Sequence, residues 1–171
     1  MNPAQDQQGR SAESRRDLAG KYLTFTLGAE EYGVPVLRVR EIIKMMDITL
    51  VPQVPPYVKG VVNLRGKVIP VVDLRLKFGF PPQEYTERTS IIVVEVDLAG
   101  SRALMGIVVD RVSDVMGIAA EEIEETPEFG NRINTDYMKG IAKVKGKVEI
   151  LLDLDRVFSA DAGFGDLSRV A

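Results

Sequence analysis

Apolar and polar residues alternate along several short segments of the chain, which is the pattern of half-buried β-strands. Near the start, Leu23, Phe25 and Leu27 alternate with polar or amphipathic neighbours, so one face of this strand should be buried. Further strands are expected at residues 32–36, 61–65, 68–72, 90–96 and 103–109. Pro35 should end its strand early or place it at a sheet edge. Many short strands with turn residues between them predict an all-β barrel architecture.

The strand pattern occurs twice. Residues 59–78, KGVVNLRGKVIPVVDLRLKF, align without gaps on residues 139–158, KGIAKVKGKVEILLDLDRVF, and eight of the twenty positions are identical. Upstream, residues 32–42 align more weakly on residues 105–115. Two similar blocks in the same order indicate two copies of one small fold, joined by a linker at 79–88. Any function specific to the pair should then lie in the seam between the copies.

Turn and cap residues follow the same duplication. Gly66 and Gly146 each stand between two apolar runs, where a tight hairpin turn needs a residue with positive φ. Asp73 and Asp153 follow the two hairpins and are expected to cap short helical turns. Apolar residues at helical spacing predict short helices at two aligned places. These places are residues 37–44 and the segment containing Val112, Val115 and Met116.

Length and composition bound the organisation of the chain. Its 171 residues suffice for one ordinary domain or two small ones, and 45% apolar residues are enough for a core. We expect disordered tails at 1–20 and 160–171 on either side of one ordered unit at 21–159. Within this unit, the sequence predicts a first barrel at about 21–80 and a second at about 89–159, and it allows strands to be exchanged between them.

Charge and missing residue types exclude several classes of function. A net charge of −3 provides no basic field for a phosphate backbone, so no nucleic acid is expected as a partner. Neither a membrane-spanning stretch nor a secretory leader is found, so the expected location is cytoplasmic. Histidine and cysteine are both absent, which excludes histidine-based triads, thiol nucleophiles and the usual zinc sites. We therefore expect a protein that is not an enzyme and holds no cofactor or metal.

Three weaker motifs are better explained by ordinary structure. The Gly-Lys pairs at 66–67 and 146–147 lack the flanking residues of a phosphate-binding loop, and they are typical of hairpin turns. Asp73 follows a strand as a phosphorylated aspartate does, but the alternating strands and helices of a receiver domain are not indicated. The five glutamates between residues 121 and 128 are typical of a solvated face.

The pattern alone leaves the role of Arg65 open. This arginine stands beside the turn glycine of an otherwise apolar hairpin. Turn tips are usually solvated, and an arginine there often has no further role. Arginine is also enriched at binding hot spots, which makes Arg65 a candidate interface anchor.

The run from Tyr57 to Arg75, YVKGVVNLRGKVIPVVDLR, resembles the signature of the CheW family of bacterial chemotaxis coupling proteins. Other stretches agree with this family in order, over about residues 20–159. They are EYGV leading into VREI in the first half, and GIVVD leading into VSDV and GIAK leading into LLDL in the second. The resemblance implies two tandem-duplicated, five-stranded SH3-like barrels packed on a shared apolar seam, with a few short helices.

The resemblance also implies a function, that of a non-catalytic adaptor. Members of the family couple transmembrane chemoreceptors to the chemotaxis histidine kinase, so the implied partners are the regulatory domain of that kinase and the cytoplasmic tip of methyl-accepting receptors. The protein would be a stand-alone coupler without a kinase core or a receiver. It would be a monomer in isolation and able to enter rings within receptor arrays. Receptors would recruit it to the inner face of the cell membrane without direct insertion.

Partner-binding positions carry over residue by residue. In the first half they match Val39, Glu41, Gly60, Asn63, Leu64 and Arg65, and in the second half they match the receptor-groove positions Val109 and Val112. The resemblance does not decide which partner each residue contacts. The alternative function is a phospho-accepting or carboxylate-based regulatory enzyme, which would need an aspartate such as Asp73 or Asp110 with a perturbed pKa.

Overall fold

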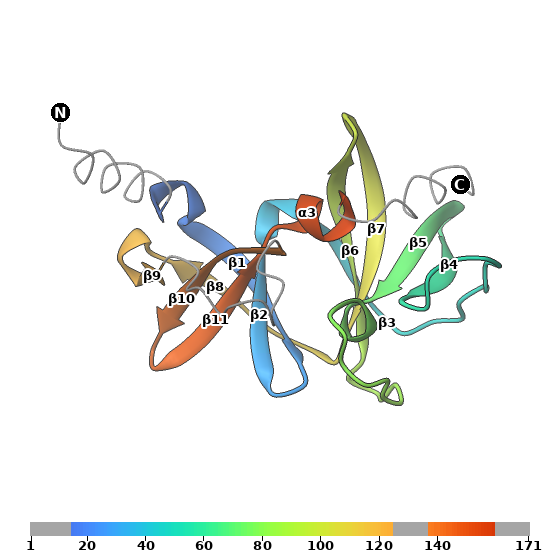
Figure 1. Cartoon of the computed structure of the whole chain (residues 1–171), viewed down its shortest axis with the longest axis horizontal. Helices are drawn as coiled ribbons and strands as arrows, with labels where there is room; N and C mark the ends of the chain where they lie inside the picture. Colours follow the sequence, from blue (N-terminus) through green and yellow to red (C-terminus); the bar gives the residue numbers. More distant parts are fainter. Residues whose placement is uncertain (1–14, 125–136, 160–171) are drawn as a thin grey trace.

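The computed structural model describes residues 15–124 and 137–159, which form two β-sheets lying side by side (Figure 1). The first sheet has six strands, in spatial order β8 (Arg111–Ile118), β1 (Gly20–Leu27), β2 (Glu30–Pro35), β11 (Lys147–Leu152), β10 (Met138–Val144) and β9 (Ile123–Glu124). The second has five strands, in spatial order β3 (Val39–Lys44), β6 (Ser90–Leu98), β7 (Ser101–Val109), β5 (Lys67–Asp73) and β4 (Val58–Leu64). The mainly-β fold predicted from the sequence is confirmed, although the two-residue strand β9 makes the first sheet six-stranded.

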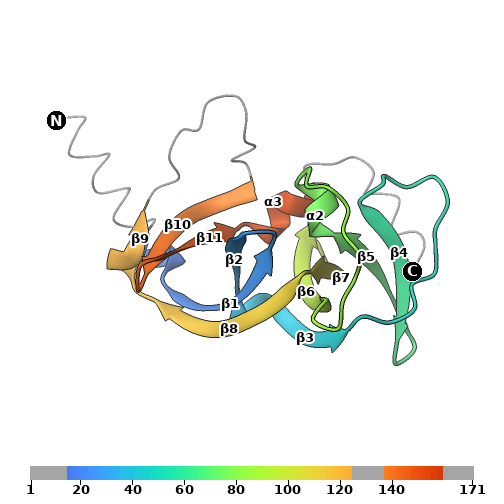
Figure 2. The same ribbon diagram turned by 90° about the horizontal axis from the view of Figure 1, so that it is seen from below.

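Short helical elements complete the described part of the chain. They are the 3-10 turns η1 (Val36–Arg38) and η2 (Ala120–Glu122) and the α-helices α2 (Leu74–Lys77) and α3 (Leu154–Ser159). Both α-helices lie near the junction of the two sheets when the molecule is seen from below (Figure 2). Each one follows the second strand of a duplicated hairpin, so the repeat extends from the strands into the helices.

Each sheet takes strands from both halves of the sequence. Strand β11 lies parallel to β2 in the first sheet, and β7 lies parallel to β5 in the second. Strands β1 and β2 join the C-terminal strands, so the sheets do not divide at residues 80–89, and the prediction of barrels at about 21–80 and 89–159 allowed for such an exchange of strands. The sequence pattern did not reveal this arrangement, because parallel pairing joins strands that are distant in sequence and no local pattern specifies such a pair.

The largest apolar cluster lies between the two sheets, and we call it the seam. It draws fully buried side chains from both sheets and from α3: Phe25, Val34, Ile92, Ile107 and Phe158 are among them. Two smaller apolar clusters each belong to one sheet. The one around Val71 and Val93 belongs to the second sheet, and the one around Tyr22 and Leu151 belongs to the first. Burying one large apolar side chain stabilises a fold by about 1.5–3 kcal/mol, so the seam holds the two sheets together as one unit.

Both helices predicted from apolar spacing are wrong. Residues 39–44 form strand β3 after the single turn η1, and residues 111–118 form strand β8. Burial in β3 alternates from residue to residue, as it should in a strand with one face on a core. Val36 and Val39 pack on the seam where the chain crosses between the sheets, so their spacing of three imitates one face of a helix.

The predicted turns and caps are confirmed. Arg65 and Gly66 have φ values of 50° and 86°, which is the pattern of a two-residue hairpin turn with positive φ at both central positions. The side chain of Asp73 accepts a hydrogen bond of 2.9 Å from the backbone N–H of Arg75 and so caps α2. Asp153 accepts one of 3.2 Å from the N–H of Arg156 at the start of α3.

Most of the two predicted tails, and residues 125–136 of the acidic connection, lie outside the described residues. Residues 15–18 form a helical turn, so regular structure begins before the predicted boundary at residue 20. The hydroxyl of Tyr22 donates a hydrogen bond of 2.6 Å to the carbonyl oxygen of Leu18 and ties this turn to β1. Within the described ranges, no helix is both long and apolar enough to span a bilayer.

Glu149 is a buried carboxylate in strand β11. Its side chain is fully buried, and neither carboxylate oxygen has a hydrogen-bond partner in the described part of the chain. Glu31 lies opposite on the parallel strand β2, and the aligned residue of the first repeat is the apolar Ile69. Burial, together with the nearby Glu31 carboxylate, raises the pKa of Glu149 to about 7, against the opposing effect of Lys147.

We expect Glu149→Gln to stabilise the protein increasingly as the pH rises. The carboxyl binds its proton more tightly in the folded state than its ordinary pKa of 4.5 allows in the unfolded state, so its ionisation opposes folding between about pH 4.5 and pH 7. The advantage of the variant in free energy of unfolding should grow by about 2 kcal/mol between pH 5 and pH 8.5. Urea unfolding at both pH values measures this difference.

Glu124→Gln is the matched control, since the Glu124 side chain is 56% exposed and, in the part of the chain that the structure describes, forms an ion pair with Lys143 alone. The free energy of unfolding of Glu124→Gln should differ from that of the wild type by the same small amount at both pH values. An equal effect of Glu149→Gln at pH 5 and pH 8.5 would show that ionisation of this residue is not linked to folding.

Candidate partner-binding site

A pocket of about 460 Å³ opens at one end of the five-stranded sheet, and we call it the charged pocket. Its floor is apolar, formed by Leu64, Ile69, Val93, Ala103 and Leu104. Its rim consists of six charged residues from β3, β5, β6 and β7 and the turn after β4: Arg40, Glu41, Arg65, Lys67, Glu95 and Arg102. An apolar floor inside a polar rim is the arrangement of a protein-binding surface.

Arg65 and Glu41 form a two-pronged ion pair across the rim. Each guanidinium Nη atom of Arg65 donates to one carboxylate oxygen of Glu41, and the bond from Nη1 to Oε1 measures 2.9 Å. This hydrogen bonding holds the pKa of Glu41 below its usual range. The Arg65 side chain is 71% exposed, so the pair contributes little to folding, yet it fixes the guanidinium in one orientation at the surface.

A second carboxylate on the rim is held between two arginines. Glu95 accepts a hydrogen bond of 2.5 Å from Nε of Arg40 and forms an ion pair of 3.3 Å with Arg102. Lys67 forms no ion pair within the described residues. The rim therefore presents four cations against two carboxylates, and this excess favours a partner surface that carries acidic groups.

Asn63 supports the turn that carries Arg65. Its side-chain oxygen accepts a hydrogen bond of 2.9 Å from the backbone N–H of Gly66. This bond closes the hairpin loop and keeps the turn in the conformation that projects Arg65. Asn63, Leu64 and Arg65 thus act together, with one side chain bracing the turn, one on the pocket floor and one on the rim.

Gly60 is buried in β4 and lies apart from the charged pocket. Its φ is 139°, and a Cβ at this position would lie 2.8 Å from the carbonyl carbon of Thr49 and closer still to the carbonyl oxygen. Thr49 exchanges two backbone hydrogen bonds with Val61, which brings the β3–β4 connection against the strand. The geometry therefore explains this glycine by close backbone packing.

The other three residues matched to the family gather at the seam. Val39 begins β3 and Val112 lies in β8, and both are half-buried against the seam cluster. Val109, the last residue of β7, is 1% exposed. Val109 therefore supports the seam from inside and presents almost no surface of its own, whereas Val39 and Val112 flank the two points where the chain crosses between sheets.

Sequence reasoning missed several exposed residues near these positions. The rim residues Arg40, Glu95 and Arg102 were not expected, because Arg40 lies in β3, which was predicted as a helix, and Glu95 and Arg102 come from strands distant in sequence from the Arg65 turn. Even a pattern of period two in residues 39–44 would have placed Arg40 and Glu41 on opposite faces of a strand, whereas both border the pocket beside an irregular register. Among large apolar residues, Ile42 and Val68 on the second sheet are exposed, and so are Val115 and Val148, which align with them on the first sheet.

The aspartates considered for an enzymatic function are engaged in structural contacts. Asp73 is buried, caps α2 and accepts a hydrogen bond of 3.0 Å from the hydroxyl of Tyr85. Asp110 accepts bonds of 2.6 Å from Arg75 and 2.8 Å from the backbone N–H of Gly28. Both carboxylates thus accept hydrogen bonds that stabilise the local fold.

Comparisons with known proteins identify the family. The family model described as "CheW-like domain" matches residues 21–162. The chain is 40% identical over 141 residues to "Chemotaxis protein CheW" of Klebsiella aerogenes, and the match covers 82% of each chain. It is 35% identical over 143 residues to the protein of the same name from Bacillus subtilis, and this match covers 83% of this chain and 88% of that one.

A solved structure agrees with these sequence matches. The scaffolding protein TtCheW from Thermoanaerobacter tengcongensis is 35% identical, with a TM-score of 0.73 over 82% of this chain and 93% of that chain. The fold, the sequence identity and the family model all match CheW proteins, and the chain belongs to the CheW family of chemotaxis scaffold proteins.

Proposed function

We propose that this protein couples transmembrane chemoreceptors to the chemotaxis histidine kinase as a non-catalytic adaptor. Membership of the CheW family supports this role. The observation that carries the proposal is the division of the family-matched residues with accessible surface into two groups on one body. One group, with Glu41, Leu64 and Arg65, borders the charged pocket, and the other, with Val39 and Val112, borders the seam.

The seam is the proposed contact for the receptor. A receptor tip is a helical hairpin, and a helix binds by laying its apolar face into an apolar groove. Val39 and Val112 lie at the edges of the largest apolar cluster and are only half-buried there, so they offer apolar surface to such a helix.

The second sheet is the proposed contact for the regulatory domain of the kinase. The charged pocket has an apolar floor and a rim with excess cations, which suits a partner face with acidic side chains. Exposed Ile42 and Val68 add apolar surface on the same sheet. The aligned Val115 and Val148 give the first sheet a similar surface, which supports contacts between barrels, including rings of the adaptor within receptor arrays.

On this proposal the protein works in the cytoplasm, at the inner face of the cell membrane, where receptors hold it without direct insertion. Each single contact need not be strong, because the receptor array raises the effective concentration of every partner. The receptor state would then reach the kinase as a shift between two arrangements of the assembly.

Kinase activity in receptor-containing membranes tests the proposal. With the cognate receptor and kinase present, addition of this protein should raise the rate of kinase autophosphorylation, and receptor ligand should change that rate. Kinase activity that is the same with and without the protein would contradict the adaptor role. Incubation with a small phosphodonor tests the alternative, and a gain in mass would support a phospho-accepting regulator.

A further inference from the structure

Two ion pairs connect the sheets at the points where the chain crosses between them. The first crossing is η1, and Arg38 in it pairs with Asp155 of α3. The second crossing is at Asp110 between β7 and β8, and this residue pairs with Arg75 of α2. We call these pairs the first clasp and the second clasp. Each one joins a crossing segment to the helix that follows a duplicated hairpin.

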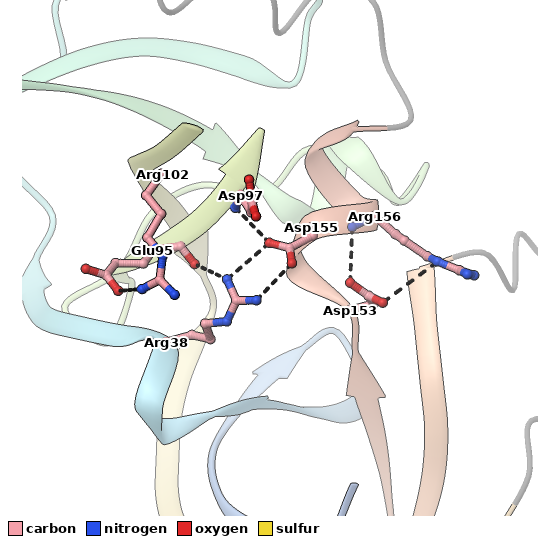
Figure 3. A network of polar contacts seen from close by, with 7 residues as sticks. All are labelled: Arg38, Glu95, Asp97, Arg102, Asp153, Asp155 and Arg156. Carbon is pink, nitrogen blue, oxygen red and sulfur yellow. Dashed lines mark hydrogen bonds and ion pairs between the residues drawn. The ribbon is translucent and has the colours of Figure 1, made fainter. Parts of the chain in front are cut away.

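The first clasp joins η1 to α3 and is anchored on β6 of the second sheet (Figure 3). Arg38 donates to the two carboxylate oxygens of Asp155 at 3.1 and 2.8 Å, and its Nη1 also donates to the carbonyl oxygen of Glu95 in β6 at 3.1 Å. The backbone N–H of Asp97 donates to Asp155 at 2.8 Å. Partial burial disfavours the charged carboxylate, but the bonds from Asp97 and Arg38 outweigh it and hold the pKa of Asp155 below its usual range.

The second clasp is likewise anchored by a backbone N–H. Arg75 donates to Oδ2 of Asp110 at 2.6 Å, and the backbone N–H of Gly28, in the turn between β1 and β2, donates to the same oxygen at 2.8 Å. Arg75 follows β5 in the second sheet, whereas Gly28 belongs to the first. The Arg75 side chain is only 14% exposed, so solvent competes weakly with this pair.

The two clasps occupy matching places with opposite charge. The repeat aligns Arg75 with Asp155, and it aligns Asp110 with Leu37, the neighbour of Arg38. If α2 docked at the first crossing, two arginines would meet, and if α3 docked at the second crossing, two aspartates would meet. Such repulsion specifies which helix belongs to which crossing, although the duplicated helices have similar sequences.

We propose that the two clasps are positioning elements that hold the two sheets at one angle and thereby let a contact at the seam influence a contact on the second sheet. This inference rests on the proposed adaptor function. The clasp residues are not among the residues proposed here to contact the receptor or the kinase. Their part is to keep the proposed receptor surface and the proposed kinase surface in one fixed relation, which a body with a loose seam would not maintain.

The test compares binding with coupling in the variant that combines Arg38→Ala with Asp110→Ala. We expect its affinities for receptor alone and for kinase alone to stay within about twofold of wild type, because neither substituted side chain lines the charged pocket and Arg38 bonds the backbone carbonyl of Glu95 rather than its rim carboxylate. Receptor-dependent kinase activation at saturating protein should fall about fivefold or more. Arg156→Ala is the matched control on α3, because within the described residues Arg156 forms an ion pair with Asp153 alone, at 3.8 Å, and it should leave activation unchanged.

A distance measurement tests the clasps independently of the partners. The chain contains no cysteine, so Val68→Cys and Val148→Cys place one spin label on each sheet at exposed positions. We expect a single narrow distance distribution in the otherwise wild-type protein and a broadened one in the clasp variant. Wild-type activation in the clasp variant, activation lost only in proportion to single-partner affinity, or an unbroadened distribution would overturn the proposal.

These results separate failure of the clasps from failure of the proposed function. If the wild-type protein neither binds the partners nor activates the kinase, the adaptor role fails, and the label distances alone decide whether the clasps fix the angle. If the wild-type protein activates the kinase and the clasp variant does so equally well, the adaptor role stands and the positioning role is refuted.

Discussion

Reversing the charge at Arg65 should cut receptor-dependent kinase activation about tenfold or more while leaving the fold intact. Arg65→Glu removes the guanidinium that the rim presents and places a second carboxylate beside Glu41. Arginine held in one orientation is a frequent binding hot spot, and a like-charged pair at an interface is repulsive. The melting temperature should hardly change, because the Arg65 side chain is 71% exposed. Kinase autophosphorylation in receptor-containing membranes, with thermal unfolding alongside, measures both effects.

Lys145 provides the matched control for this variant. It occupies the same position of the same turn in the second hairpin, with a φ of 52° against 50° at Arg65. It carries the same charge and is also exposed, but it does not border the charged pocket. Lys145→Glu should therefore leave activation near the wild-type value. Equal losses in the two variants would attribute the effect to net charge and would remove Arg65 from the binding site.

Replacing Gly60 by alanine should lower the free energy of unfolding by roughly 3 kcal/mol or more. Two costs combine here: the φ of 139° is unfavourable for any residue with a side chain, and the new Cβ would overlap the carbonyl group of Thr49. The strand or the β3–β4 connection must move to relieve this overlap. Urea unfolding of the variant and of the wild type measures the loss.

Gly100→Ala separates the two costs. Gly100 also has a positive φ, 84°, but a Cβ there would have no neighbour within 4 Å. Its replacement should cost only about 1 kcal/mol. If Gly60→Ala costs no more than Gly100→Ala, the close approach to Thr49 does not limit the fold. If Gly60→Ala costs more than Gly100→Ala, as we expect, a loss of coupling in Gly60 variants is explained by disruption of the second sheet around β4.

Local patterns predicted the hairpins, their turns and their caps because all the atoms involved lie within a few residues. The turn at Arg65 and Gly66 and the cap at Asp73 depend only on residues up to three positions away. The repeat itself also showed that the second hairpin would copy the first. For these parts of the fold, sequence and structure agree residue by residue.

The remaining features depend on contacts between distant segments. Pairing of β2 with β11 brings Glu31 and Glu149 together across more than half of the chain, and no local pattern reveals this contact. Strand β3 has one half-buried face, and its pairing with β6 has an irregular register between Val39 and Glu41. For both reasons the sequence of β3 does not show the alternation of apolar and polar residues that is typical of a strand. Aligning the repeats gives one usable signal, because Glu149 stands where the first copy has the buried Ile69.

The candidate site divides in the same way. Glu41, Leu64 and Arg65 come from two strands and a turn, and the structure brings all three to one pocket. Gly60 and Val109 matched the family's binding positions, yet burial gives each of them a packing role in this chain. The family resemblance thus proposes binding positions, and the arrangement of the strands separates those with accessible surface from those that are buried.

Co-sedimentation of kinase with receptor-containing membranes tests the adaptor role most directly. We expect the kinase to stay in the supernatant with membranes alone and to enter the pellet when this protein is added. The protein itself should pellet with the receptor in the absence of kinase. A protein that remains in the supernatant, or a kinase whose distribution does not depend on it, would contradict its role as the link between receptor and kinase.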